Sequence, residues 1–270
     1  LIKNEDVDYF ELNATKGQRL SLEIEAIRLS GPLFDPYVAI LDSNRFEVAT
    51  SDDTELLLQD STLSMIVPND GKYYIEVRES SYRGGDNFYY RLHVGNFPRP
   101  LIAFPAGGQA GKLLSVKLMG DPTGPIQKNI QLPEKEDLSF GYRVEQNGLI
   151  APSPNLIRVC EFPSILEIEP NDERGSATAT ELNLPLAFDG IIEKENDQDW
   201  FKFKAKKGQK FNLIAHAQSI SSPLDPVLNL YDAEGKSIKG NDDANNGRDS
   251  LITITIPKDG DYFLRVRDHL

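Results

Sequence analysis

Cysteine is almost absent from this chain, because Cys160 is the single one among 270 residues. One cysteine cannot form a disulfide within the chain, and it cannot supply the several thiolates of a Cys-based zinc site. Its apolar neighbours Ile157, Val159 and Phe162 predict a small buried side chain rather than a reactive thiol.

Basic residues are in the minority, with 29 Lys and Arg against 42 Asp and Glu and a formal charge of −13. Phosphate backbones are bound by clustered Lys and Arg, so this balance argues against nucleic acid as a partner. An acidic surface keeps a protein soluble. Some of the carboxylates can instead hold a divalent cation.

Long apolar runs are missing too. No stretch approaches the roughly 18 apolar residues that a membrane-spanning helix needs, so we expect no membrane span. Leu1 is not followed by the basic and apolar regions of a signal peptide, so any such peptide lies outside this sequence.

The signatures of common hydrolases are also absent. His93, His216 and His269 lie far apart, and neither an HExxH nor a GxSxG motif occurs. We therefore expect no enzyme activity. The alternative that the 42 acidic residues leave open is a pair of carboxylates of the kind that glycosidases use.

What the sequence does hold is a long internal repeat. EDVDYFELNATKGQ, which begins at Glu5, returns as NDQDWFKFKAKKGQ at Asn196, 191 positions later. PNDGKYYIEVRE at Pro68 returns as PKDGDYFLRVRD at Pro257, 189 positions later. A long, nearly constant offset indicates a duplicated domain with a different segment between the copies. We call them copy one and copy two.

Within copy one the apolar residues alternate with polar ones, which is typical of strands with one buried face. This pattern and the turns between its segments predict strands at 10–14, 20–26, 37–41, 63–67, 73–77 and 87–94. The fold class that follows is all-β, with two jelly-roll-like antiparallel β-sandwiches separated by a small β domain. The repeat further predicts that Phe10/Phe201, Leu22/Leu213, Met65/Ile254 and Tyr73/Tyr262 are buried as equivalent pairs.

The segment between the copies follows a different pattern. Phe97-Pro98-Arg99-Pro100 is predicted to be a stiff linker. Strands are expected at 101–104, 113–119, 126–132, 138–144 and 156–162. We therefore predict a sandwich at 1–96, a small β module at 97–165 and a second sandwich at 166–270.

The two copies resemble the bacterial pre-peptidase C-terminal domain. Copy two carries the motifs of that family, which are an E-P-N-D segment from Glu169, D-x-D-W-F from Asp197, K-G-Q from Lys207, L-D-P from Leu224 and P-x-D-G-x-Y from Pro257. Copy one has no counterpart of the E-P-N-D segment, and copy two has none of Asn87–Val94. We therefore expect the sequence to be part of a longer chain, with copy one lacking its opening segment and copy two its last strand. The middle segment is similar to small immunoglobulin-like modules.

The resemblance implies an exported bacterial protein that is secreted, periplasmic or on the cell surface. It also implies a calcium site, because distantly similar collagen-binding domains of clostridial collagenases hold calcium with an E-x-E-P-N-D segment and a D-x-D strand. The residues here that match are Glu167, Glu169, Asn171, Asp172, Asp197 and Asp199. Copy one keeps Asp6 and Asp8 alone, so we expect it to bind calcium poorly or not at all.

Other interpretations of these polar segments remain open. The E-P-N-D segment can be a lid that hydrogen-bonds only its own backbone. The acidic loop Gly240–Asp249 departs from an EF-hand, because Ala244 and Thr253 stand where acids are needed; a self-capping turn or a weak cation site is expected. Trp200 either packs beneath the E-P-N-D segment or offers a ring to a ligand.

Three functions are consistent with these features. The first is a non-catalytic accessory or adhesion region of an exported multidomain protein, with a structural calcium site in the second sandwich. The second is a C-terminal processing or folding-assistance region of a secreted peptidase, and the third is a carbohydrate- or matrix-protein-binding module. The expected partners are an unknown extracellular polymer or protein and the neighbouring domains of the same chain.

Overall fold

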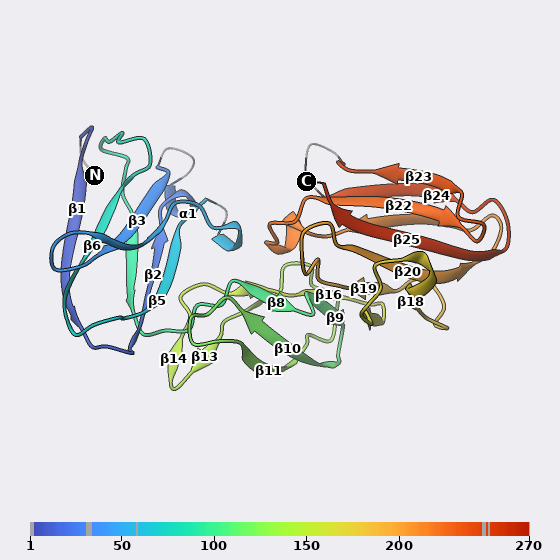
Figure 1. The fold of residues 1–270 in the computed structure, drawn as a ribbon, viewed down its shortest axis with the longest axis horizontal. Helices are drawn as coiled ribbons and strands as arrows, with labels where there is room; N and C mark the ends of the chain where they lie inside the picture. The colour runs from blue at the N-terminus through green and yellow to red at the C-terminus, as the bar shows by residue number, and fades with distance from the viewer. Residues whose placement is uncertain (1–2, 31–33, 58, 245–246, 248, 270) are drawn as a thin grey trace. The chain divides into compact units, whose positions relative to one another are not determined.

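The computed structural model describes residues 3–30, 34–57, 59–244, 247 and 249–269. Within these ranges the chain is all-β, as predicted, with several antiparallel sheets and a single four-residue α-helix, α1 (Ile27–Ser30) (Figure 1). It forms two compact units, and the middle segment contributes to both. One unit comprises Leu1–Ala103, Lys117–Gln127 and Gly141–Asn155, and the other Phe104–Val116, Lys128–Phe140 and Leu156–Leu270. The predicted domain boundaries at 96/97 and 165/166 stay predictions.

Copy one is built from two antiparallel sheets. The first has the strand order β1-β6-β3-β4 and the second the order β5-β2-β7. Apolar side chains from both sheets form one core, in which Leu22, Ile40 and Ile75 are fully buried or nearly so. The elements are β1 (Val7–Ala14), β2 (Arg19–Glu25), α1, β3 (Pro36–Leu41), β4 (Glu47–Ser51), η1 (Glu55–Leu57), β5 (Thr62–Ile66), β6 (Gly71–Glu79) and β7 (Arg91–Gly95).

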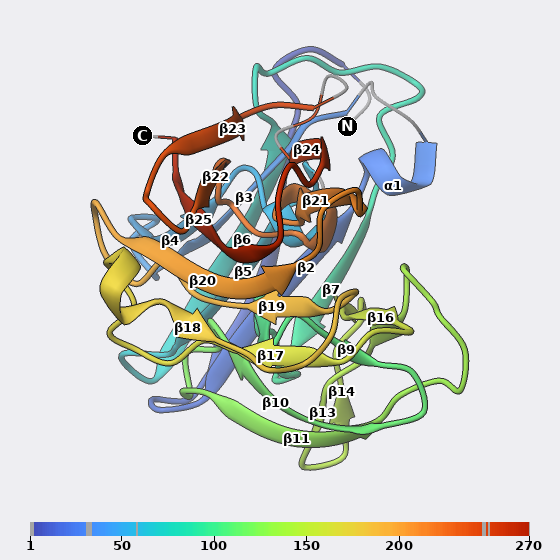
Figure 2. The same ribbon diagram turned by 90° about the vertical axis from the view of Figure 1, so that its right-hand side faces the viewer.

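Copy two repeats this arrangement with additions at one edge. Its larger sheet has the order β18-β20-β25-β22-β23, and β21 pairs with β24 in the second sheet (Figures 1 and 2). The elements are η2 (Arg174–Ser176), β18 (Thr178–Ala179), β19 (Ala187–Asp189), β20 (Gln198–Ala205), β21 (Lys210–Ala215), η3 (Gln218–Ile220), β22 (Pro226–Asp232), β23 (Ser237–Asn241), β24 (Ser250–Thr255) and β25 (Gly260–Asp268).

The two copies share their strand registers. Leu12 lies opposite Tyr73 in copy one, and Phe203 lies opposite Tyr262 at the same place in copy two. The predicted burial of equivalent pairs holds in both copies only for Tyr73 and Tyr262.

The other three pairs are only partly as predicted. Leu22 is buried but Leu213 is half-buried, and Ile254 is buried but Met65 is half-buried. Phe10 is 43% exposed and Phe201 is 3% exposed, because β18 pairs with β20 at Phe201 and the Phe188 ring stacks on that residue at 4.6 Å. The described residues of copy one contain no counterpart of β18 or β19 beside Phe10.

The middle segment consists of short strands. Three of the five predicted strands are close to β8, β10 and β11, but 138–144 and 156–162 are mostly broken up. The β9–β16 and β17–β19 pairs are parallel. The elements are β8 (Ile102–Phe104), β9 (Gly107–Gln109), β10 (Leu113–Met119), β11 (Ile126–Gln131), β12 (Gly141–Tyr142), β13 (Glu145–Gln146), β14 (Leu149–Ile150), β15 (Asn155–Leu156), β16 (Arg158–Cys160) and β17 (Ser164–Leu166).

The predicted linker at residues 97–100 is buried rather than solvated. The Arg99 side chain has no exposed surface and forms an ion pair with Glu23 at 3.2 Å. Its Nη1 donates to the carbonyl of Ser153 at 2.6 Å, and its backbone amide donates to Asp121 at 2.8 Å. Burial lowers the pKa of Arg99 to about 10. The charged side chain of Arg99 therefore holds in place the segment that follows copy one.

Substitution Arg99→Met should destabilise the first compact unit by about 1.5–3 kcal/mol, because the buried Glu23 carboxylate loses one of its two cations and keeps Arg28 at 3.3 Å. Urea unfolding followed by circular dichroism measures the loss. The exposed Arg91→Met is the matched control and should change stability by less than about 0.5 kcal/mol. The double variant Arg99→Met/Glu23→Gln should lose less than Arg99→Met alone; an equal or larger loss would contradict this account.

Candidate metal centre

The segment that opens copy two is held against the sandwich by its backbone. The Glu167 amide donates to the carbonyl of Asp189 at 2.9 Å, which continues the β17–β19 pairing. The Trp200 amide on β20 donates to the carbonyl of Asn171 at 3.1 Å. These bonds place residues 167–172 beside the start of β20, where Asp197 and Asp199 lie.

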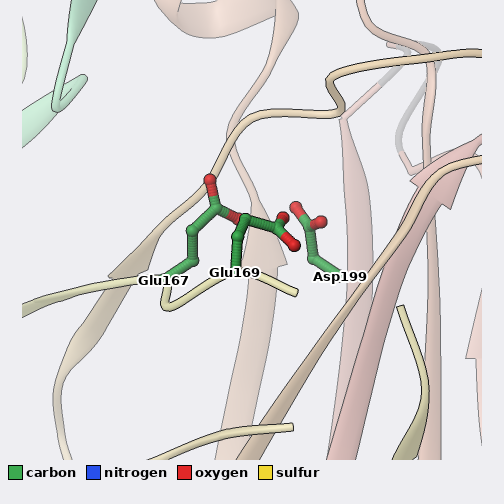
Figure 3. A group of neighbouring side chains, drawn as sticks. All are labelled: Glu167, Glu169 and Asp199. Atoms are coloured by element: carbon green, nitrogen blue, oxygen red, sulfur yellow. The ribbon is translucent and has the colours of Figure 1, made fainter. Parts of the chain in front are cut away.

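Five of the six predicted ligands form two overlapping acidic groups. One consists of Glu167, Glu169 and Asp199, and the other of Glu169, Asp172 and Asp197. In each group, one carboxylate oxygen from every residue lies within 4.8 Å of the others. Figure 3 shows the first group, with Glu167 and Glu169 on the opening segment and Asp199 on β20. The sixth predicted residue, Asn171, is completely buried beside them.

Several oxygens in this cluster are buried without a hydrogen-bond donor. They are Oε2 of Glu167 and Oδ1 of Asn171, Asp172 and Asp199. A buried oxygen without a partner loses its hydration and gains nothing in return. Four such atoms lie in a cluster of residues that could hold a metal ion.

Three other carboxylate oxygens of the cluster accept hydrogen bonds from backbone amides. Ile191 N donates to Glu167 Oε1 at 2.7 Å, Asn171 N to Glu169 Oε2 at 2.9 Å, and Glu193 N to Asp197 Oδ2 at 2.6 Å. These backbone amides orient one oxygen each of Glu167, Glu169 and Asp197, and leave Oε2 of Glu167 without a hydrogen-bond donor.

Lys194 distinguishes the two groups. Its Nζ lies 3.2 Å from Asp172 Oδ2 and 3.9 Å from Asp197 Oδ1, so the second group already has a cation beside it. That ammonium group lowers the pKa of Asp172. Among the described residues, no Lys or Arg forms an ion pair with Glu167, Glu169 or Asp199. The first group is therefore the stronger candidate for a metal ion.

The carboxylates of the first group resist ionisation when no cation is present. Burial, followed by the charge of Glu167, raises the pKa of Asp199 to about 8. Burial also raises the pKa of Glu167 to about 7, with the charge of Glu169 adding to the shift. Such shifts are what like charges in a partly dry site produce, and a bound divalent cation reverses them.

Gly190 is part of the site although the sequence patterns did not single it out. A Cβ atom at this position would lie 2.5 Å from Glu167 Oε2 and 2.8 Å from Asp199 Oδ2. Only glycine lets these two carboxylates approach the backbone here. The sequence signal that could have pointed to it is the Asp189-Gly190 dipeptide just before the D-x-D strand.

In copy one the equivalent carboxylate has a different partner. The hydroxyl of Tyr90 donates to Asp8 Oδ2 at 2.6 Å. Neither Asp6 nor Asp8 belongs to a group of three possible metal ligands among the described residues. The weaker calcium binding expected of copy one stays a prediction.

Trp200 is bonded to the opening segment through its backbone amide, and its ring has further partners. The ring instead contacts Tyr231, with centroids 5.0 Å apart, and the Arg265 guanidinium lies 5.6 Å from the ring centroid. Trp200 is half-buried, so packing against its own sheet is the larger part of its role.

The acidic loop 240–249 is described except for residues 245, 246 and 248. Asp249 Oδ1 accepts hydrogen bonds from the amides of Ala217 and Gln218, both at 2.8 Å, at the start of η3. Asn241 Oδ1 accepts from the Leu251 amide at 2.8 Å. Two polar side chains of the loop thus accept hydrogen bonds from backbone amides of neighbouring segments, as the side chains of a capping turn do.

Cys160 is half-buried and lines a cavity instead of lying in the core. Burial raises the pKa of its thiol.

The fold and the acidic cluster together define a pair of related β-sandwiches, one of which carries a candidate cation site. Residues 6–79 and 197–268, more than half of the chain, match the model of the bacterial pre-peptidase C-terminal domain. The chain belongs to this family, whose domains are non-catalytic accessory domains of secreted bacterial peptidases.

A probable subtilase-type serine protease of Deinococcus radiodurans is 41% identical over 99 residues. That match covers 36% of this chain and only 14% of the relative. No helix among the described residues is long and apolar enough to cross a membrane.

Two solved structures are weakly similar. One is the M60 catalytic domain with two CBM51 domains of Clostridium perfringens ZmpB, with 12% identity, a TM-score of 0.23 and coverage of 96% of this chain and 31% of that one. The other is tripeptidyl peptidase 2, with 8% identity, a TM-score of 0.22 and coverage of 98% and 20%. At TM-scores this low neither likeness identifies a fold or a function. These matches give no support to an immunoglobulin-like middle segment or to a link with collagenases.

Without calcium, the stability of copy two should fall as the pH rises from about 5 to 8. At pH values between the ordinary carboxyl pKa and the raised pKa values of Glu167 and Asp199, the folded state binds more protons than the unfolded state. Raising the pH through this range therefore favours unfolding. Asp199→Asn removes one charge and should be more stable than the parent at pH 8 in EDTA, with a smaller difference at pH 5. Thermal unfolding followed by Trp200 fluorescence measures this, and a parent that is equally or more stable at pH 8 would contradict it.

Proposed function

We propose that this chain is a non-catalytic accessory region of an exported bacterial multidomain protein, and that copy two holds one structural calcium ion. The observation that carries the calcium proposal is the set of four buried, unpartnered oxygens on Glu167, Asn171, Asp172 and Asp199. Calcium binds six to eight hard oxygen ligands, often from carboxylates and side-chain amides. The donor set here is of that kind.

Electrostatics supports the same proposal. Two carboxylates about 4–5 Å apart repel each other by roughly 1–4 kcal/mol, between the limits for water and for a protein surface. The group of Glu167, Glu169 and Asp199 contains three such pairs. A divalent cation turns this repulsion into attraction, whereas a lid that hydrogen-bonds only its own backbone leaves it in place.

The ion would fasten the opening segment to the sandwich. Glu167 and Glu169 lie on that segment, and Asp199 lies on β20. The same segment leads into β18 and β19, which cover Phe201. Calcium therefore acts on the packing of the apolar core, and its role is structural rather than catalytic.

The function of the region as a whole is to support or attach other domains of the protein. Its proposed partner is an extracellular polymer or protein. A role in the folding or processing of a secreted peptidase is the second candidate, and the similarity to a probable subtilase-type serine protease favours it. Expression of the full-length protein with and without this region separates the two, since only the second role requires the region for a mature, active peptidase.

Calorimetric titration of the chain with calcium should give one site, with a Kd on the order of 10⁻⁴ M as in other extracellular modules. At about 2 mM calcium this corresponds to roughly 1.8 kcal/mol of stabilisation. Asp199→Asn and Glu167→Gln should abolish binding, whereas the exposed Glu181→Gln should not. Asp8→Asn in copy one should leave the stoichiometry unchanged. If calcium gives no heat and no shift in melting temperature, the E-P-N-D segment is only a lid that hydrogen-bonds its own backbone.

Gly190→Ala should weaken calcium binding by about tenfold or more, because the added methyl group occupies the space of the Glu167 and Asp199 oxygens. Gly175→Ala is the matched control, since a Cβ there meets nothing within 4 Å. The same titration measures both variants. Equal affinities would show that these two oxygens do not bind the ion.

A further inference from the structure

The two acidic groups of copy two share one residue. Glu169 belongs to the first group, with Glu167 and Asp199, and to the second, with Asp172 and Asp197. Figure 3 shows the Glu169 carboxylate beside that of Asp199. The two groups therefore form one continuous cluster of five carboxylates. The number of divalent ions that such a cluster takes depends on what else neutralises it.

Lys194 supplies a positive charge at one end of this cluster. Its Nζ donates to Asp172 Oδ2 at 3.2 Å and lies 3.9 Å from Asp197 Oδ1. The Asp197 carboxylate is almost completely buried, so water screens its attraction to the ammonium group less than it would at an open surface. Among the described residues, no other Lys or Arg forms an ion pair with the second group. Lys194 is therefore the cation that the protein itself provides to this group.

The backbone places this lysine in a turn that both copies contain. The Asp197 amide donates to the carbonyl of Lys194 at 3.2 Å, and Asn196 within the turn has a φ of 64°. Copy one repeats the turn, with the equivalent hydrogen bond to the carbonyl of Lys3 at 3.3 Å and a φ of 61° at Glu5. Lys3 and Lys194 are 191 positions apart, which is the offset of the repeat in this region. The lysine thus belongs to the fold of the turn, and in copy two the opening segment brings carboxylates to it.

A divalent ion in the second group would compete with this ammonium group. Calcium binds carboxylate oxygens at about 2.3–2.6 Å, so an ion on Asp172 Oδ2 would lie within about 6 Å of Lys194 Nζ. Two cations at this separation repel each other. The first group has no such ammonium neighbour among the described residues, and it contains the unpartnered Oδ1 of Asp199, a residue that is 3% exposed. The first group is therefore where an ion binds with less opposition.

The balance of charge indicates the same arrangement. The five carboxylates carry five negative charges when all are ionised, and one calcium ion with Lys194 supplies three positive charges. Without the lysine charge, one calcium ion would leave three negative charges, and a second ion would reduce these to one. Removal of the lysine charge therefore increases the attraction of the cluster for a second ion.

We propose that Lys194 acts as the second cation of this cluster and limits it to one divalent ion. This inference rests on the calcium proposal above, in which the ion binds at the first group. The ammonium group neutralises the second group and joins Asp172 of the opening segment to the 194–197 turn with or without calcium. Loss of the lysine charge then creates a second site for a hard divalent cation, formed by Glu169, Asp172 and Asp197.

The test is the number of calcium ions that the whole chain binds in equilibrium dialysis. The parent should bind one ion and Lys194→Met two, the second with a Kd on the order of 10⁻³ M because the first ion lies close by. Lys194→Arg keeps the charge and should bind one ion. Lys204→Met is the matched control, since it removes an exposed lysine that pairs with Glu181, and it should also bind one ion.

Two double variants locate the second ion. Lys194→Met/Asp172→Asn should return to one ion, because it removes a ligand of the second group. Lys194→Met/Asp199→Asn should also bind one ion, which is then held by the second group alone. Two ions in either double variant, or none in the second, would place the additional ion elsewhere and contradict the proposal.

A measurement without metal tests the role of the lysine separately. In EDTA at pH 8, Lys194→Met should melt roughly 2 °C or more below the parent, because the second group loses its cation. Lys194→Arg should melt with the parent. Calcium should remove the deficit of Lys194→Met, since the second ion replaces the missing charge. A deficit that calcium leaves unchanged would show an ordinary surface ion pair and overturn the proposal.

The stoichiometries separate this proposal from the calcium proposal. One ion in both the parent and Lys194→Met overturns the role of Lys194 and leaves the calcium proposal standing. Two ions in the parent also overturn it. No ion in the parent and one in Lys194→Met supports the role of Lys194 and refutes calcium binding by the parent chain. No ion in either overturns both.

Discussion

An apolar core between two sheets has to be covered on every side, and this requirement governs most of what distinguishes the two copies. Copy two covers its core at the opening side, where β18 and Phe188 lie over Phe201. Copy one covers its core at the closing side, where β7 and the residues before it pack against β2 and Phe34. Phe201 is buried beneath this cover in copy two, and Leu22 and Ile24 are buried beneath theirs in copy one.

The acidic cluster depends on the same covering segment. Residues 167–172 bring Glu167 and Glu169 to Asp199 because their backbone is bonded to β19 and β20. The opening segment therefore brings both apolar cover and negative charge to the sandwich. Packing favours its association with β20, and repulsion between carboxylates opposes it. A cation at the cluster removes the opposing contribution, which is why metal binding and core packing should respond together.

Much of the fold could be predicted from the sequence, because alternation and turn residues are local signals. The repeat predicts the shared strand registers of the two copies. The family resemblance predicts the clustering of five acidic residues, which are Glu167, Glu169, Asp172, Asp197 and Asp199. Gly190 could not be found this way, since its importance lies in a close approach between distant segments. The same holds for Phe10, whose alternation is that of a buried residue although its side chain is 43% exposed. The parallel pairs β9–β16 and β17–β19 were not predicted, because the sequence of a three-residue strand does not indicate which strand it pairs with.

The buried guanidinium of Arg99 has a consequence for how this protein would be digested. Proline-rich segments between domains are usually where proteases cut, because such chain is exposed and can adapt to an active site. Residues 97–100 are enclosed, and Arg99 is joined to Glu23, Asp121 and Ser153 from three separate stretches of the chain. A protease of broad specificity would have to await local opening before it could cleave within this segment. Copy one should then persist in digests together with the parts of the middle segment that enclose that arginine, and not as a fragment ending at residue 96.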